Sequence, residues 1–380
     1  MRIYWYWPFA RPEELVLAES VPRPHDVLVV HTIAGRVEPG ATRSVADVAS
    51  AVEVRATLPG HETRRERSVG WLASRARTYL QRVRARRTAV VAGGFDVAHI
   101  VYLNYFTDWY ALRRLRRSVP VVCDVHDVVP HQARVPRRLE RALLARQYAA
   151  ATAIVVHHDA VRDQLVRDFP VDRDRVAVVP WPIFPVRAEP RSAPQATRRV
   201  LVFGTLRRNK GIDVFLDATA RLRERADIEF TIAGRGFPDV EDAVRAAAAR
   251  DPRVRAEVGY VDAAHKDELF RSADLVVLPY TTFASQSAVL HDAYAHHRPV
   301  VVTDVGALGV SVRTDGTGIV VAPSDPAALA SAIVAALDDP ERWAARAERA
   351  GAIARERHPE VVGAALRALY DRVVAAEVAR

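Results

Sequence analysis

Short β-rich runs alternate with helix-like segments along almost all of the 380 residues, and this alternation limits the possible folds more than any other feature. It is typical of parallel βαβ units, in which each helix connects two neighbouring strands. Helical patterns in the first half cover 64–90, 107–117, 137–150 and 159–168. The strand-like runs around them are RIYWYW, DVLVVHT, VEVRATL, DVAHIVY, PVVCDVH, AIVVHH and VAVVPW. The sequence therefore predicts an α/β protein with parallel sheets.

A proline-rich stretch, 180–199, interrupts the alternation and has no periodicity, which indicates a linker. The strand pattern then restarts with VLVFGTL, IEFTIAG, VRAEVGYV, DLVVLPY, PVVVTDV and GIVVAP. Helical patterns cover 211–224, 239–250 and 264–272, and further helices run from Pro326 to the C-terminus. We therefore predict two Rossmann-like, doubly wound domains. The predicted bounds are 1–185 for the first domain, 186–199 for the linker, 200–355 for the second domain, and 356–380 for a C-terminal helix that packs back toward the first domain.

The composition excludes several classes of protein. A hydrophobic content of 49% with 27% charged residues describes a globular chain rather than a disordered one. No apolar run reaches the roughly 18 residues that a membrane span needs, and the N-terminus does not have the pattern of a secretory signal. The single cysteine, Cys123, excludes an internal disulfide and a CxxC site. We therefore expect a cytoplasmic protein.

The net charge of +9 comes almost entirely from arginine, because only Lys210 and Lys266 are lysines. This bias suggests a GC-rich coding sequence and makes scattered arginines weak indicators of function. Residues 64–87 are more informative, since they combine an apolar stripe with many arginines. Such a helix suits an anionic membrane surface, and it equally suits packing of its apolar side on a core. No motif for nucleic-acid binding is present, so we expect no nucleic-acid partner.

In parallel α/β sheets, ligands bind at the carboxyl ends of the strands. FTIAGRGFPDV has two of the three glycines of a dinucleotide fingerprint, and no phosphate-binding GxxxxGK[ST] loop is present. FGTLRRNKG follows a predicted strand and places Arg207 three residues before Lys210. A guanidinium and an ammonium at a strand end suit a diphosphate. The alternative is a loop whose charges are only solvated.

The segment TTFASQSAVLHDAYAHHRPVVVTDVG joins two predicted strands through a helix-like run that starts at Ser285. Ser285 or Ser287 is predicted to cap this helix, whose N-terminus favours an anion. Asp292 follows Ser285 by seven residues, so both lie on one helix face roughly 10 Å apart. That spacing fits phosphates at the helix start and a ribose diol at the carboxylate. From the spacing alone, a polar cap with a surface acid is the better interpretation.

Residues 200–345 resemble the C-terminal half of the GT4-type retaining glycosyltransferases, which have the GT-B fold. The resemblance rests on GTLRRNKGID, IAGRG, GYV and ASQSAVLHDAYAHHRPVVVTDVGAL, which occur in the order of the family's motifs. FDVAHIVY, VPVVCDVHDVVPHQAR and ATAIVVHHDAVRDQLVRDFPVDRDRVAVVP extend it into the first half. The resemblance covers roughly 95–345 and implies two Rossmann-like domains, with the acceptor bound by the first and the nucleotide sugar by the second.

The chain departs from the family pattern at three places. Ala284 stands where the first glutamate of E-x7-E is usual, although a branch with Q-S-G-V or Q-S-G-I here also lacks that acid. His297 replaces the usual glycine before Arg298. The Gly-Gly loop after the first strand is absent and WPFARPEE stands in its place. The first difference leaves donor-sugar contacts to neighbouring polar groups, and the last makes the acceptor side unusual.

The resemblance implies a role for each matching residue. Arg207 and Lys210 would bind the donor diphosphate and stabilise the leaving nucleotide, and Asp292 would hold the ribose. His126, with Asp127 and His131 beside it, matches the family's histidine near the donor sugar. His157 and His158 end the next strand, where they are weaker candidates. The other implied donor contacts are Gly204, Gly234, Arg235, Tyr260, Val261, Ser285, Gln286, Ser287, Ala288 and Val289.

The resemblance implies an enzyme that transfers a hexose-type sugar to an acceptor hydroxyl with retention of anomeric configuration. The donor would be a UDP- or GDP-linked sugar, and the acceptor a sugar, a lipid-linked sugar or a small molecule. No metal ion or other cofactor is expected. Two alternatives remain: a sugar-nucleotide epimerase of the same fold, and a catalytically silent binding protein. The protein is also expected to touch the inner face of the cell membrane if 64–87 binds anionic lipid.

Overall fold

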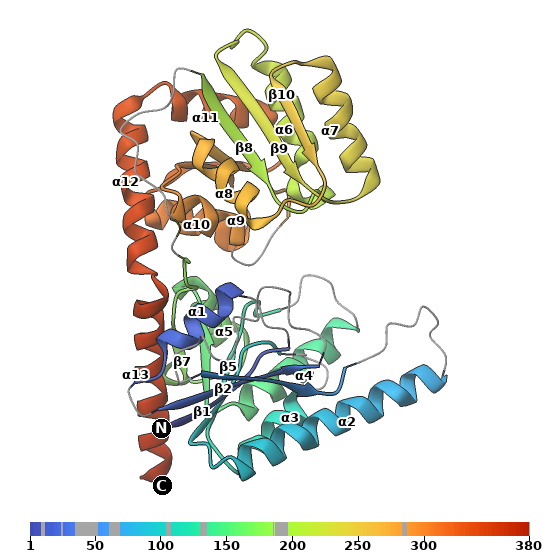
Figure 1. The fold of residues 1–380 in the computed structure, drawn as a ribbon, viewed down its shortest axis with the longest axis vertical. Coiled ribbons are helices and arrows are strands. Elements are labelled where there is room, and N and C mark those ends of the chain that lie inside the picture. The colour runs from blue at the N-terminus through green and yellow to red at the C-terminus, as the bar shows by residue number, and fades with distance from the viewer. Residues whose placement is uncertain are drawn as a thin grey trace. The chain divides into compact units, whose positions relative to one another are not determined.

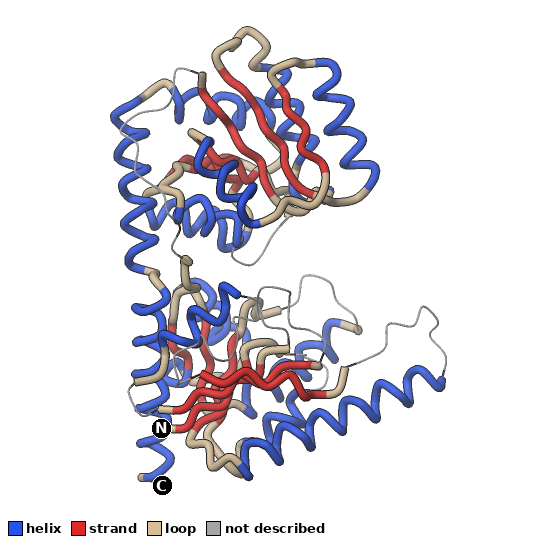
Figure 2. Tube along the Cα trace, viewed as in Figure 1, coloured by secondary structure: helices blue, strands red, loops and turns tan. Residues whose placement is uncertain are grey.

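The computed structural model describes residues 1–8, 12–23, 26–34, 52–60, 69–103, 108–129, 135–184, 186, 197–282 and 287–379. The chain forms two compact units, of which the first comprises Met1–Pro182 with Pro359–Arg380 and the second Ile183–His358. In each unit, helices lie on both faces of a sheet of parallel strands (Figures 1 and 2). The prediction of two Rossmann-like, doubly wound domains is therefore confirmed.

The sheet of the first unit has the strand order β3-β2-β1-β4-β5-β6-β7, and every neighbouring pair is parallel. Its strands are β1 (Arg2–Tyr6), β2 (Val27–Ile33), β3 (Val52–Leu58), β4 (Val97–Ile100), β5 (Val121–Asp124), β6 (Ala153–Val156) and β7 (Val176–Val178). Strands β4, β5 and β6 are buried at every position. This explains why they read as continuous apolar runs in the sequence.

The helices of the first unit are α1 (Pro12–Ser20), α2 (Val69–Ala92), α3 (Asp108–Leu115), α4 (Arg137–Ala150), α5 (Asp159–Asp168) and α13 (Pro359–Val378). The last of these is the C-terminal helix, which contacts α1 along the edge of this unit (Figure 1). Gly363 makes this packing close, because a Cβ there would lie 2.5 Å from the carbonyl oxygen of Ser20. Further along α13, the Tyr370 hydroxyl accepts a hydrogen bond from the Trp5 indole at 3.0 Å. The C-terminal helix is thus part of the first unit's core.

The sheet of the second unit has the order β10-β9-β8-β11-β12-β13, again with parallel neighbours. Its strands are β8 (Arg198–Phe203), β9 (Ile228–Gly234), β10 (Val254–Val258), β11 (Leu275–Leu278), β12 (Val300–Thr303) and β13 (Gly318–Val321). Its helices are α6 (Ile212–Arg221), α7 (Pro238–Arg250), α8 (Ala263–Ser272), α9 (Ala288–Ala295), α10 (Gly306–Asp315), α11 (Pro326–Leu337) and α12 (Pro340–Glu356).

Two apolar clusters cover the two faces of the second sheet, and residues of one strand alternate between them. Val200 and Val202 of β8 lie in the cluster that includes residues of α6, α7 and α11. Leu201, between them, lies in the other cluster, with residues of α8, α9 and α10. Successive side chains of a strand point to opposite faces, so this alternation follows from the pleat. The core therefore fixes the register of β8, and the loop that contains Arg207 and Lys210 follows its carboxyl end.

His297, which stands where the family usually has glycine, closes helix α9 in a left-handed conformation with φ 57°. Its amide donates to the carbonyl of Tyr294 at 3.0 Å, and the amide of Arg298 donates to Ala293 at 2.8 Å. This pair of hydrogen bonds is a Schellman motif, in which glycine is the usual residue. A Cβ at Gly351 of α12 would lie 2.7 Å from the His297 ring, so a glycine there makes room for the imidazole.

Several element bounds differ from the predicted ones. The basic helix predicted over 64–90 is described from Val69 to Ala92, and residues 64–68 lie outside the described residues. The helix predicted from Ser285 begins only at Ala288, because Ser287 has an extended backbone and is the N-cap residue; residues 283–286 lie outside the described residues. Helices α1 and α10 were not predicted. Among the described residues, none of the helices has the length and apolar character that spanning a membrane requires.

Candidate functional site

In the second unit, the loops that follow β8 and β11 lie against each other where the strand order reverses. The amide of Thr281 donates to the carbonyl of Asn209 at 3.0 Å, and the Asn209 side chain donates to the carbonyl of Thr282 at 3.2 Å. Gly211 has φ +63°, and a Cβ there would lie 1.9 Å from the carbonyl oxygen of Pro279. A glycine is therefore needed where the two loops meet. This is the topological switch point, at which α/β sheets bind ligands.

Glycines also bring the ends of β8 and β9 and the start of α9 together. Gly234 has φ +139°, and a Cβ there would lie 1.9 Å from the carbonyl oxygen of Gly204. A Cβ at Gly204, which has φ +118°, would lie 3.3 Å from Cγ2 of Val289. Backbone groups thus line this edge of the sheet with little side-chain bulk. The positive end of the α9 dipole lies beside them, which favours an anionic ligand.

Two predicted cations, Arg207 and Lys210, lie in the loop that follows β8. The Lys210 ammonium is over the ring of Tyr280, with Nζ 3.5 Å from the ring centroid. Burial, and to a smaller extent the charge of Arg207, lower the pKa of Lys210 to about 8. Arg207 is exposed and forms no ion pair within the described part of the chain, whereas Arg208 is paired with Asp239 at 2.8 Å. An anion bound here would relieve the repulsion between Arg207 and Lys210.

Asp292, predicted to hold a ribose, is paired with the second lysine of the chain. Its Oδ1 accepts a hydrogen bond from Nζ of Lys266 at 3.0 Å, and the two side chains are 26% and 31% exposed. Lys266 lies in α8, and nothing in its local sequence indicated a site. Both lysines of this arginine-rich chain therefore lie in the loops and helices around one switch point.

Ser287, one of the two predicted capping residues of α9, does not cap the helix through its side chain. Ser287 occupies the N-cap position but makes no side-chain capping hydrogen bond. Its hydroxyl is buried and instead lies 2.9 Å from the hydroxyl of Tyr280. This contact holds the Tyr280 ring against which Lys210 packs, so Ser287 positions Lys210 indirectly. Ser285 and Gln286 lie outside the described residues, as does Ala284.

The remaining predicted donor contacts lie around the same edge of the sheet. Gly234 ends β9, and Arg235 follows it with an exposed side chain. Tyr260 follows β10 and is 81% exposed, with the partly buried Val261 next to it. An aromatic ring so exposed at a strand end can stack on a planar ligand. Ala288 and Val289 form the first turn of α9, where Ala288 is exposed.

The first unit contains a buried chain of hydrogen bonds that the sequence did not indicate. The Trp5 indole donates to the Tyr370 hydroxyl, which lies 2.5 Å from Nδ1 of His99. Nε2 of His99 lies 2.8 Å from Oδ1 of Asp124. Burial raises the pKa of the Tyr370 hydroxyl well above its ordinary value, so it remains a donor. The hydroxyl then donates to His99, and His99 donates to Asp124.

Asp124 is a charged carboxylate despite its burial. Burial by itself raises its pKa, but the nearby imidazoles of His99, His157 and His126 outweigh that effect and lower the pKa below its ordinary value. His126 follows two residues later, and its ring centroid lies 5.1 Å from that of His157. The indole of Trp181 meets both rings edge to face, at 5.1 and 4.9 Å.

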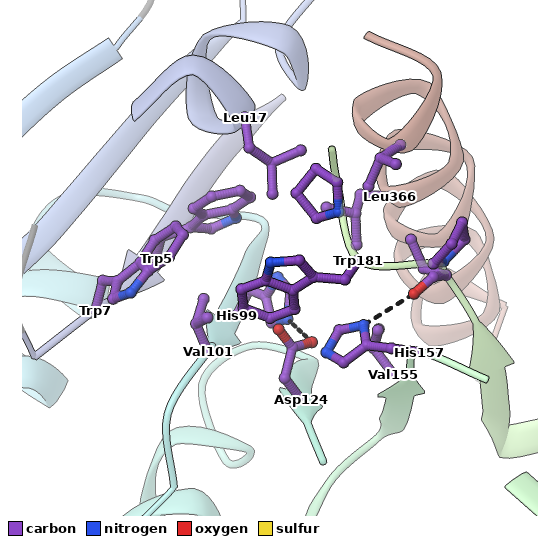
Figure 3. Close-up of a pocket in the computed structure, with 14 residues that line it drawn as sticks. Trp5, Trp7, Leu17, His99, Val101, Asp124, Val155, His157, Trp181 and Leu366 are labelled. Atoms are coloured by element: carbon purple, nitrogen blue, oxygen red, sulfur yellow. Dashed lines mark hydrogen bonds and ion pairs between the residues drawn. The ribbon is translucent and has the colours of Figure 1, made fainter. Parts of the chain in front are cut away.

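These groups border a pocket of the first unit (Figure 3). In Figure 3 the side chains of Asp124, His99 and His157 lie below the Trp181 ring, while Leu366 and Leu17 close the opposite side. The lining comes from Trp5, Trp7, Leu17, His99, Val101, Asp124, Val155, His157, Val179, Pro180, Trp181, Pro182, Val362 and Leu366. Asp127 is partly buried beside His126, and His131 lies outside the described residues. His158 caps α5 by accepting the amide of Ala160 at 3.1 Å.

The structure thus gathers the predicted residues into two groups. Arg207, Lys210, Asp292 and the glycines surround the switch point of the second unit, and His126 lies with His157 at the strand ends of the first. Five residues of these groups escaped prediction: Lys266, Tyr280, His99, Asp124 and Tyr370. Their partners are far away in sequence, so a local motif could not identify them.

Two family models match the chain in consecutive parts. Residues 17–186 match the model described as Glycosyltransferase Family 4, and 197–339 match the one described as Glycosyl transferases group 1. A D-inositol 3-phosphate glycosyltransferase of Geodermatophilus obscurus is 31% identical over 314 residues, which cover 75% of this chain and 69% of that protein. The chain belongs to this glycosyltransferase family.

Other members of the glycosyltransferase family match over shorter stretches. An α-D-kanosaminyltransferase of Streptomyces kanamyceticus is 33% identical over 154 residues, which are 40% of this chain and 39% of that protein. A glycogen synthase of Mycobacterium tuberculosis is 33% identical over 49% of this chain and 43% of its own length. The chain thus spans less than half the length of these two relatives.

Solved glycosyltransferase structures share the fold over the whole chain. A sucrose-phosphate synthase from Thermosynechococcus elongatus has a TM-score of 0.74 at 18% identity, with 99% of this chain and 100% of that chain covered. HepE of Anabaena, in complex with UDP, has a TM-score of 0.64 at 17% identity, with both chains covered completely. At such identities the likeness establishes the GT-B fold and nothing finer.

Proposed function

We propose that the protein transfers a hexose-type sugar from a nucleotide-diphosphate sugar to an acceptor hydroxyl, with retention of anomeric configuration. Membership of the glycosyltransferase family supports the reaction class. The proposal rests mainly on the loop after β8 that contains Arg207 and Lys210, which we call the cation loop. The two cations lie beside a sheet edge that is lined by backbone groups. Retention and the type of sugar are part of the proposal on the basis of the motif resemblance.

The cation loop has three properties that suit a diphosphate. The exposed guanidinium of Arg207 can bind two phosphate oxygens at once. Lys210 adds a point charge that is partly desolvated, so its attraction to an anion is screened less than at an open surface. The glycines and the N-terminus of α9 let backbone amides approach the same phosphates. Each group stabilises more charge after the sugar leaves than before, as catalysis requires.

The proposed step is a front-face displacement. The bond between C1 of the donor sugar and the diphosphate oxygen breaks, and its electron pair leaves with the nucleoside diphosphate. The acceptor oxygen forms its bond to C1 on the same face, and the acceptor proton passes to the leaving diphosphate. Arg207 and Lys210 hold the departing charge, and His126 contacts the donor sugar. No residue of the chain forms a covalent bond in this step.

We propose that the nucleoside of the donor binds on the side of the switch point that lies opposite the cations. Asp292 would accept hydrogen bonds from the ribose hydroxyls, and its contact with Lys266 holds the carboxylate in place. Arg235, Tyr260 and Val261 would border the base. A UDP- or GDP-linked sugar is proposed, and the UDP in the complex of HepE supports a uridine donor. The acceptor is proposed to be a sugar, a lipid-linked sugar or a small molecule.

We also propose that helix α2 docks on an anionic membrane surface from the cytoplasmic side. Only part of the predicted apolar stripe remains for this role, because Val83 is buried in the core together with Arg86 and Val90. The outer side of the helix carries four exposed arginines, at 75, 77, 84 and 87. Leu80 and Val91 are 44% and 57% exposed among them. A basic face with scattered apolar groups suits anionic lipid headgroups.

The test is product analysis with UDP- and GDP-sugars and a panel of acceptor glycosides. We expect a glycoside whose anomeric proton coupling shows the configuration of the donor, and loss of that product in Arg207→Ala and Lys210→Ala with the circular dichroism spectrum unchanged. Full activity in both variants would refute the proposed roles. A donor isomer formed without acceptor would instead identify an epimerase, and no turnover with any donor would indicate a silent binding protein.

A further inference from the structure

Three metal-ligating groups lie together at the strand ends of the first unit. Asp124 ends β5, His126 follows it two residues later, and His157 follows β6, which pairs with β5. Each offers one ligand atom, and these atoms all lie within 4.8 Å of one another. Around a four-coordinate zinc ion at about 2.0–2.1 Å from its ligands, donor atoms are about 3.3 Å apart. The distances between the three ligand atoms would therefore shorten by at most about 1.5 Å when the ion binds.

Each of the two imidazoles directs one ring nitrogen to a backbone carbonyl. Nδ1 of His157 lies 2.9 Å from the carbonyl oxygen of Val179, to which only an N–H can donate. Nε2 of His126 lies 3.1 Å from the carbonyl oxygen of Val101, so this nitrogen also carries the N–H. In the neutral rings the lone pairs are then at Nε2 of His157 and Nδ1 of His126. Donation of the second ring nitrogen to a backbone carbonyl is the usual outer contact of metal-binding histidines.

The third ligand, Asp124, is buried and is oriented by an outer contact. His99 donates to its Oδ1, which uses one of about four lone-pair sites of a carboxylate. His99 itself is engaged at both nitrogens, by Asp124 and Tyr370, so it acts as an outer partner and not as a ligand. The Trp5–Tyr370–His99 chain thus aims the carboxylate.

The surroundings of the cluster are mostly apolar. Trp181 covers both ligand imidazoles, and the pocket above them is lined mostly by apolar side chains (Figure 3). A bound ion would offset the cost of burying the Asp124 charge.

We propose that Asp124, His126 and His157 form a binding site for one divalent transition-metal ion, with zinc as the best match. Two imidazoles and one carboxylate, with a water molecule in the remaining position, are a ligand set that zinc accepts. Harder cations such as Mg²⁺ prefer oxygen ligands and fit this set poorly. The site supplies no step of the sugar transfer, for which no metal is expected.

The test titrates the full-length protein, stripped with EDTA and desalted, with Co²⁺ as a spectroscopic probe and then with Zn²⁺ in competition. We expect one Co²⁺ per chain with visible bands of four- or five-coordinate geometry, and one equivalent of Zn²⁺ that displaces it. His126→Gln and His157→Gln are expected to weaken zinc binding at least 100-fold. His99→Gln, which removes only the outer contact, is expected to weaken it about tenfold. No saturable binding by the wild type would overturn the proposal.

The matched control is His265→Gln, which removes an exposed histidine that is paired with Glu257 in the second unit. It is expected to bind zinc as the wild type does. If it lost the ion while His157→Gln kept it, the site would lie elsewhere and the proposal would fail. If a variant of the cluster did not fold, the wild type alone would decide, because X-ray absorption of its zinc complex must show nitrogen and oxygen neighbours only, including imidazole scattering. Absence of imidazole scattering would contradict the assignment.

Zinc binding also has an expected consequence that rests on the proposed function. A bound ion takes the Nδ1 lone pair of His126 and fixes its ring, so one equivalent of zinc is expected to lower the transfer rate. The binding experiment uses no nucleotide sugar, and its outcome is therefore independent of whether the protein transfers sugar. Zinc that binds without changing the rate would leave the site intact and remove only this consequence.

Discussion

Lys210 gives a pH dependence that can be calculated from its surroundings. Its pKa is lowered to about 8 by burial and by the charge of Arg207. A bound diphosphate favours the protonated form, so the pKa rises in the complex. Well below pH 8 the ammonium is already charged and binding is at full strength. Above pH 8 a proton must be taken up with the ligand, and the affinity falls by about tenfold between pH 7 and 9, where the protonated fraction falls from about 0.9 to 0.1.

The assay is isothermal titration calorimetry with UDP and, in parallel, GDP, between pH 6.5 and 9.5. The second phosphate ionisation of the ligands is near 6, so the ligand charge is almost constant above pH 7. Lys210→Arg is the matched control, because guanidinium stays protonated and the slope above pH 8 should vanish. Lys210→Ala should lose roughly 1.5–3 kcal/mol, which is about 10- to 150-fold in Kd. A flat wild-type profile, or an equal slope in Lys210→Arg, would refute the reasoning.

Three further predictions concern the surroundings of the site. Calorimetry should show that Lys266→Met weakens UDP or GDP binding only about threefold, because its partly exposed ion pair with Asp292 is screened by solvent. Asp292→Asn should weaken the same binding tenfold or more. A larger loss of affinity in Lys266→Met than in Asp292→Asn would contradict the ribose role. Gly211→Ala should lower the urea midpoint of unfolding more than the control Gly94→Ala, since both glycines have positive φ but only a Cβ at 211 would meet a carbonyl oxygen. The expected loss of unfolding free energy is about 2 kcal/mol or more for Gly211→Ala and about 1 kcal/mol for Gly94→Ala, and equal losses would exclude the clash. Glutamate at the two exposed arginines 75 and 77 should abolish sedimentation with anionic vesicles but not change binding to neutral ones, and unchanged sedimentation would remove α2 as the docking face.

The sequence predicted the parallel α/β architecture because the inner strands are buried on both faces. Strands such as β5 and β6 therefore appear as uninterrupted apolar runs, and their ends place His126 and His157 without knowledge of the structure. The same reasoning placed Lys210 at the end of β8. Helix α1 escaped because proline and acids at 12–14 within WPFARPEE were interpreted as a loop replacement.

Contacts between distant residues could not be predicted in the same way. Tyr280 lies under Lys210 because β11 is the neighbour of β8 at the switch point, an adjacency that depends on the strand order and not on a motif. Tyr370 reaches His99 across 271 positions because α13 packs on the first unit. Ser287 has the right residue type and backbone for a cap, yet its hydroxyl pairs with Tyr280, since that buried phenol also needs a partner.

The central claim is that the cation loop of the second unit binds the diphosphate of a nucleotide sugar. The most direct measurement is calorimetric binding of UDP-glucose and GDP-mannose to the wild type, to Arg207→Ala/Lys210→Ala, and to the surface control Arg223→Ala, which removes an exposed pair with Glu224. We expect one donor to bind at one per chain, unchanged affinity in the control, and at least a 100-fold loss in the double variant with its melting temperature retained. Equal affinity in all three proteins, or binding of neither donor by the wild type, would contradict the claim.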